Sequence, residues 1–179
     1  MQIEEAIKKV SVASDMYFQQ KTAISSSSPR GVIIVNALKS LKKAIEAMLS
    51  TNNLSEEYRV TVSKGQSNLP RNLYVAVVRS LGKLSTEPCV CLCFNEQGTG
   101  FVLGMMYPQN YMKNTKYEKV RRNENEIKIN LNSKRSKANF NNLYVNPMEF
   151  LVEAIDFREF ENQLKESIQL LASEYKNEY

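Results

Sequence analysis

The chain has 179 residues and carries 24 Lys and Arg against 19 Asp and Glu, which gives a net charge of +5. It contains no His, and this absence excludes Ser-His-Asp and Cys-His catalysis as well as His-ligated zinc and haem. Asp15 and Asp156 are its only aspartates, so paired acids for metal-dependent phosphoryl chemistry are scarce. The composition therefore favours a binding domain over an enzyme, and we expect neither catalytic residues nor a metal or cofactor.

No stretch approaches the roughly 18–20 continuous apolar residues that a membrane-spanning helix needs. The acidic start, residues 1–5, lacks the basic-then-apolar order of a signal peptide, so we expect a cytoplasmic protein with no membrane partner. Cys89, Cys91 and Cys93 fall on one face of any strand that contains them. They would form either a metal or redox site or part of a core. The core interpretation is favoured because no second ligand cluster would complete a metal site.

Helix-like spacing of apolar residues occurs in three places. Residues 3–20 and 32–50 each carry an apolar stripe with a three-to-four-residue period. Lys39, Lys42 and Lys43 lie mostly off the second stripe, on the expected solvent face. Asp156 followed by Glu159 is typical of a capped helix start and predicts a third helix from there to the C-terminus.

The middle of the chain has strand character. Strands are predicted over 58–63, 73–78, 89–94 and 101–106, with a short one at Ile127, Ile129 and Leu131. Runs this apolar indicate strands covered on both faces, and the terminal helices are the expected covers. The prediction is an α/β or α+β fold, with a mixed sheet of about five strands flanked by two N-terminal helices and one long C-terminal helix. We expect a single domain, 1–179, divided into helices (1–55), sheet and basic loop region (56–155) and C-terminal helix (156–179).

Charge is distributed unevenly along this plan. Residues 111–140 carry nine Lys and Arg against three Glu, whereas residues 148–179 carry three against eight acids. Aromatic residues such as Tyr111 and Tyr117 are interleaved with the basic ones. Cations beside aromatic faces favour binding of nucleic acid, although a solvated surface loop would have the same charge.

Two short segments partly match motifs of enzymes. Gly82-Lys83 is not the end of a phosphate-binding loop, because Val77 replaces the required Gly and Leu84 replaces Ser or Thr. Glu126 and Lys128, with Glu118, would supply part of a nuclease metal site. A divergent metal-dependent nuclease is therefore retained as a minor alternative.

The stretch from Arg59 to Asn68, Arg-Val-Thr-Val-Ser-Lys-Gly-Gln-Ser-Asn, resembles the N-terminal DNA-binding domain of McrB-type modification-dependent restriction systems. That family has an Arg-Val-x-x-Ser-x-Gly-x-Gly-Asn pattern, followed by strands that correspond to 73–77, 89–94 and 101–103. Ala154 to Phe157 and the helix after them match its closing helix, so the similarity covers about two thirds of the chain. Ser67 replaces the second Gly, Leu73-Tyr74 replaces Pro-Trp, and Gln66 replaces an aromatic residue.

The resemblance implies a non-catalytic module that recognises its target in double-stranded DNA, which is expected to be modified, within a restriction or phage-defence system. In the family a methylated cytosine is flipped out of the duplex into a pocket, and a GTPase motor and nuclease subunits are the implied partners. We predict DNA contacts from Lys64, Gly65, Gln66, Ser67, Asn68, Arg71, Arg121, Arg122, Lys134, Arg135 and Lys137. The walls of a base pocket are predicted to be Tyr74, Cys93, Tyr107 and Tyr144. The alternative from another class is a protein–protein module, in which the acidic closing helix and the basic segment bind partners.

Overall fold

The computed structural model describes residues 2–18, 24–63, 69, 73–84, 86–95, 97–108, 126–129 and 142–176. For 16–18, 126–129, 142–143, 145–146 and 175–176 it describes the backbone only. In chain order the elements are α1 (Ile3–Phe18), α2 (Pro29–Thr51), β1 (Tyr58–Val62), β2 (Tyr74–Arg79), β3 (Cys89–Phe94), β4 (Gly100–Pro108), β5 (Glu126–Ile129), β6 (Asn142–Leu151), the short 3-10 helix η2 (Val152–Ala154) and α4 (Phe157–Lys176). Among these residues no helix is both long and apolar enough to cross a bilayer.

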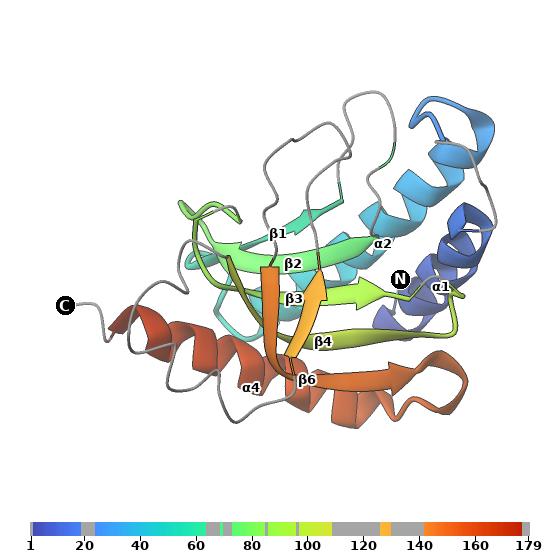
Figure 1. Cartoon of the computed structure of the whole chain (residues 1–179). Coiled ribbons are helices and arrows are strands. Elements are labelled where there is room, and N and C mark those ends of the chain that lie inside the picture. Colours follow the sequence, from blue (N-terminus) through green and yellow to red (C-terminus); the bar gives the residue numbers. More distant parts are fainter. Residues whose placement is uncertain are drawn as a thin grey trace.

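The strands form one six-stranded sheet in the order β1-β2-β3-β4-β6-β5 (Figure 1). Every described strand pair is antiparallel, so the α+β class is confirmed, while the sheet is antiparallel where a mixed one was predicted. Parallel neighbours need a long crossover connection, usually a helix. Here the helices lie before and after the sheet in the chain, and β1 to β4 follow one another as a meander.

All three described α-helices pack on the same face of the sheet. Alternate residues of β1 to β4, such as Val75, Leu92 and Leu103, join side chains from α1, α2 and α4 in one buried cluster, the helix-side core. The opposite face holds a second buried cluster to which no described helix contributes. The expectation that the terminal helices cover both faces is therefore wrong, although β2 and β3 are buried on both sides as their apolar runs predict.

Local signals explain where the helices begin. Ser28 accepts a hydrogen bond from the Gly31 backbone N–H at 3.1 Å, and Pro29 occupies the first turn, so α2 begins three residues before the predicted Val32. The Asp156 carboxylate accepts from the backbone N–H groups of Arg158 and Glu159 at 2.9 and 3.2 Å. The predicted cap of α4 is thus confirmed.

A cluster of four aromatic rings fastens α4 to the sheet. Phe101 on β4 lies at the centre, with its ring centroid 5.4 Å from Phe94, 5.3 Å from Phe150 and 5.5 Å from Phe160. Phe160 belongs to the first turns of α4, and its ring meets Phe101 edge-on at 88°. Such pairs stabilise beyond their buried area, so this cluster fixes the position of the helix.

A β-bulge bends β6 where it crosses the middle of β4. Leu103 pairs with Met148 but Met105 pairs with Val145, so Asn146 and Pro147 together face Gly104. Proline cannot donate a ladder hydrogen bond and is found in sheets at such irregularities. The bulge explains why β6, which no strand pattern predicted, bends between its two halves in Figure 1.

Candidate functional site

The predicted DNA contacts fall in two connections, and all eleven lie outside the described residues. The first connection, 64–72, leaves β1 after Ser63 and enters β2 at Leu73. Within it Leu69 is described: this side chain is buried, and its backbone N–H donates to the Ile24 carbonyl at 2.9 Å. Leu69 is therefore hydrogen-bonded to the segment that precedes α2.

The second group belongs to residues 109–141, on either side of β5. Pro108 and Ile129 both pair with Asn142, so the end of β4, the end of β5 and the start of β6 lie side by side. The basic segment is attached to the sheet at these three points. The attachment points of the two connections lie at opposite ends of the strands, because Val62 and Tyr74 mark one end and Arg79 and Pro108 the other. A six-residue strand spans about 20 Å, so these attachment points lie roughly that far apart along the strand direction.

The structure divides the four predicted base-pocket residues between the two faces of the sheet. Tyr74, Cys93 and Tyr144 lie together in the second buried cluster, here called the cysteine-face cluster. Its members are Tyr74, Ala76, Val78, Cys89, Cys91, Cys93, Met106 and Tyr144. Tyr107 instead faces the helices, where its hydroxyl donates to the Glu174 carboxylate at 3.3 Å. Only three of the four residues are thus neighbours.

Tyr144 is held in place across two strands. Its hydroxyl donates to the Cys91 carbonyl at 2.8 Å, and its side chain has no exposed area. The strand β4 lies between Tyr144 and β3, and its residue that pairs with Cys91 is Gly104. No side chain therefore stands at that register position of β4. Burial raises the pKa of the Tyr144 hydroxyl well above its usual 10.0, and the group is a neutral hydrogen-bond donor.

Replacing Tyr144 with phenylalanine removes this hydrogen bond without changing the ring. We expect Tyr144→Phe to lower the free energy of unfolding by about 1 kcal/mol, the usual net value of a buried hydrogen bond. The measurement is urea unfolding followed by circular dichroism. An unchanged stability would show that the hydroxyl bond to Cys91 contributes nothing.

The three cysteines are buried and free, as the core interpretation predicts. Burial raises the pKa of the Cys91 thiol from 9.0 to about 12, against the opposing effect of its hydrogen bond with Tyr144. Burial also raises the pKa values of Cys89 and Cys93 well above 9.0. Since the thiolate is the reactive form, these thiols are poor nucleophiles at neutral pH. Within the described residues no group of three His, Cys, Asp or Glu side chains is placed to hold a metal ion.

These raised pKa values predict an alkaline loss of stability. The unfolded Cys91 thiol ionises near pH 9.0 and the folded one near 12, so its contribution is complete below pH 9.0 and is lost as pH rises toward 12. By about pH 11 the wild-type chain should lose roughly 2–3 kcal/mol that Cys91→Ala does not lose. Urea unfolding under reducing conditions, at about pH 8 and about pH 11, measures the difference. An equal loss in both proteins would contradict it.

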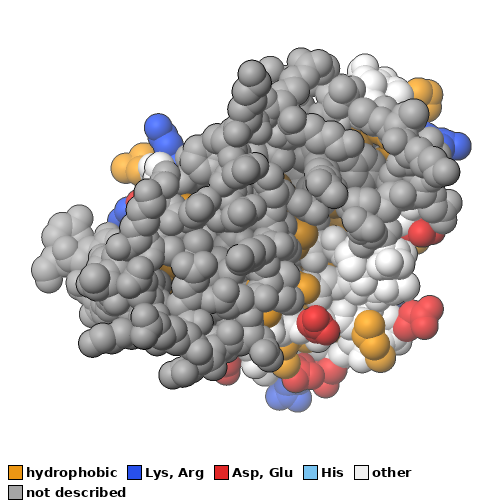
Figure 2. All heavy atoms as spheres, in the orientation of Figure 1, with side chains coloured by type: hydrophobic (Ala, Val, Ile, Leu, Met, Phe, Trp, Pro, Cys, Tyr) orange, Lys and Arg blue, Asp and Glu red, His pale blue; other side chains and the backbone are white. Residues whose placement is uncertain are grey.

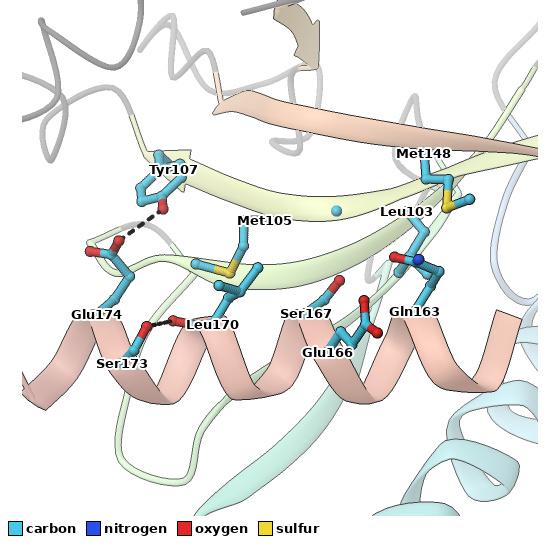
Figure 3. A pocket seen from close by; sticks show the side chains of 11 residues that line it. Leu103, Met105, Tyr107, Met148, Gln163, Glu166, Ser167, Leu170, Ser173 and Glu174 are labelled. Atoms are coloured by element: carbon cyan, nitrogen blue, oxygen red, sulfur yellow. Dashed lines mark hydrogen bonds between the residues drawn. The ribbon is translucent and has the colours of Figure 1, made fainter. Parts of the chain in front are cut away.

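A pocket of about 210 Å³ lies on the helix side, between α4 and the bulged part of the sheet (Figure 3). Leu103, Gly104, Met105 and Met148, which flank the bulge, line it from the sheet. Six side chains of α4 line it, and they form a stripe next to the stripe of α4 that faces the core: Gln163, Glu166, Ser167, Leu170, Ser173 and Glu174. Sequence reasoning missed this pocket. Its signals are Gly104, Pro147 and the two small serines, which leave space that longer side chains would fill.

The described charges near the end of β6 are acidic. Glu149 and Glu153 are exposed there, and Figure 2 shows acidic side chains on the described part of this face. The nuclease alternative gains no described site: Glu118 lies outside the described residues, and β5 is described by its backbone only at Glu126 and Lys128.

No known family, curated protein or solved structure matches the chain significantly.

Proposed function

We propose that this chain binds double-stranded DNA as the target-recognition module of a modification-dependent restriction or phage-defence system, and that it has no catalytic activity of its own. Its partners in that system would be a GTPase motor and nuclease subunits, and its place of action the cytoplasm. One observation carries the proposal. Nine Lys and Arg are concentrated in the two connections around β5 and in that strand, whereas residues 148–179 carry three Lys and Arg against eight acids.

A basic segment attached to a rigid sheet is suited to neutralise phosphates. Each phosphate contact releases counterions, so affinity comes largely from Lys and Arg and is independent of sequence. Arg121, Arg122, Lys134, Arg135 and Lys137 would supply these contacts from one end of the strands, and Lys64 and Arg71 from the other. A duplex lying along the strand direction would meet both groups.

Base recognition would come from the 64–72 connection and the strand that follows it. Gln66 and Asn68 carry amide groups that can pair with base edges, and Tyr74 begins β2 directly after this connection. Tyr74 pairs with Cys93 and is 7% exposed, so a flipped base reaches its ring only by displacing the present neighbours. Flipping costs a few kcal/mol, which stacking on the ring would offset.

The test is fluorescence anisotropy with short duplexes that are unmodified, cytosine-methylated, hydroxymethylated or adenine-methylated. We expect tighter binding to one modified duplex, and we expect Gln66→Ala with Asn68→Ala to reduce that preference more than the overall affinity. Equal affinity for all four would refute recognition of these modifications and leave a general duplex binder. Absence of binding at about 50 mM salt, where phosphate contacts are strong, would refute the proposal.

A further inference from the structure

Ser63 and Tyr74 lie opposite each other at the root of the connection 64–72. Val62 pairs with Val75, so these two residues continue the same ladder by one position. The Ser63 backbone N–H donates to the Tyr74 carbonyl at 3.0 Å, as in an antiparallel ladder. In return, the Tyr74 backbone N–H donates to the Ser63 side chain, at 2.6 Å from its Oγ. The hydroxyl itself donates to the Tyr74 carbonyl at 3.3 Å, so one side chain binds both backbone groups of Tyr74.

This hydrogen bond to the Tyr74 N–H is shielded from water. Ser63 is 4% exposed and Tyr74 is 7% exposed. A buried backbone donor that loses its partner keeps the full cost of leaving water, which exceeds the net gain of an ordinary hydrogen bond. Removing the hydroxyl therefore favours a local opening at the start of β2, in which the Tyr74 N–H reaches water.

The other side of Tyr74 is fixed by the next strand. Tyr74 pairs with Cys93 on β3, and the Leu73 carbonyl before it accepts from the Phe94 backbone N–H at 3.0 Å. The Tyr74 ring lies in the cysteine-face cluster. Because successive residues of a strand point to opposite faces, a fixed Tyr74 backbone also fixes the face on which its ring lies. The Ser63 hydroxyl and β3 together therefore determine where the ring is presented.

We propose that Ser63 is a positioning residue for base recognition, and that its hydroxyl fixes the Tyr74 backbone while the neighbours of the ring move aside for a flipped base. The inference rests on the proposed function and adds to it a residue that determines specificity without touching DNA. Stacking needs a ring in a defined place, whereas phosphate contacts come from Lys and Arg elsewhere. Loss of the hydroxyl should therefore reduce discrimination between modified and unmodified duplexes more than it reduces affinity for the unmodified one.

The first measurement needs no DNA and tests the hydrogen bond. Amide hydrogen exchange, followed by NMR, gives the protection of the Tyr74 N–H relative to that of Leu92, a fully buried residue of β3. We expect Ser63→Ala to lower this relative protection about tenfold, because the opening is local. Ser80→Ala is the matched control: the Ser80 hydroxyl donates to the Glu56 carbonyl at 2.7 Å at the other end of the same strand pair, so the relative protection should not change. An unchanged value in Ser63→Ala would overturn the proposal.

The second measurement is a ratio of duplex affinities obtained by fluorescence anisotropy: that for the modified duplex which the wild type prefers, divided by that for the unmodified one. We expect Ser63→Ala to reduce this ratio about fivefold with an unchanged salt slope, and Ser80→Ala to leave both unchanged. Equal ratios in the wild type and Ser63→Ala, or an equal loss in Ser80→Ala, would overturn the proposal.

The conservative variant Ser63→Thr separates the hydroxyl from the rest of the side chain. It keeps a hydroxyl in a residue type that suits strands, so it should restore both the Tyr74 protection and the affinity ratio. Restored protection without a restored ratio would contradict the proposal. A wild type that binds no duplex, or binds all of them equally, would refute base recognition itself and this role with it, whereas a failed exchange test would refute the role alone.

Discussion

Replacing Phe101 with alanine is expected to lower the free energy of unfolding by about 3–5 kcal/mol, the usual cost of removing a buried phenylalanine ring. Phe101 is 2% exposed and stands between Phe94, Phe150 and Phe160. Removing the ring would therefore leave a cavity between α4 and the strands β3, β4 and β6. Urea unfolding followed by circular dichroism measures the loss.

The control for this prediction is Leu81→Ala. Leu81 is the most exposed large apolar side chain among the described residues, at 99%, so its truncation should change stability by less than about 0.5 kcal/mol. A loss below about 1 kcal/mol for Phe101→Ala would mean that the aromatic cluster does not hold α4 on the sheet.

Neutralising the basic segment is expected to abolish most of the duplex affinity. The variant carries Gln at five positions: Arg121, Arg122, Lys134, Arg135 and Lys137. Because each phosphate contact contributes roughly 0.9 to the salt slope, five lost contacts should weaken binding at least a hundredfold at about 0.1 M salt. Fluorescence anisotropy with a short duplex gives the ratio of dissociation constants.

A matched control removes the same number of charges from the helices. Lys8 and Lys9 on α1 and Lys39, Lys42 and Lys43 on α2 are replaced by Gln, which changes the net charge by the same amount. These side chains lie on the helix side of the molecule, so affinity should fall less than fivefold. Equal losses in the two variants would show that overall charge, and not the segment around β5, attracts the duplex.

Much of the fold followed from local sequence signals. The bounds of β3 were predicted to the residue, because the apolar run is delimited by Pro88 and Asn95. Asp156 identified the start of α4 because a cap is a local hydrogen-bonding arrangement. The strand β6 was missed because Asn142, Asn146 and Pro147 are typical of turns, and its pairing with β4 is a long-range contact.

The site was harder to predict, because it depends on which face of the sheet each residue occupies. Tyr107 and Tyr144 belong to strands that pair next to each other, yet they point to opposite faces. The alternation within one strand is visible in the sequence, but the relative register of two strands with a bulge between them is not. The pocket beside α4 was missed for the same reason, since it lies where that bulge meets the helix.

The salt dependence of duplex affinity for the unaltered chain tests the central claim most directly. Dissociation constants for one short duplex are measured by anisotropy from about 50 to 200 mM salt. Binding through seven basic residues of the basic segment and the 64–72 connection, at roughly 0.9 each, predicts that the logarithm of the association constant falls with the logarithm of salt concentration with a slope of about −6. A slope between zero and about −1, or no binding at the lowest salt, would contradict the assignment of this chain as a DNA-binding module.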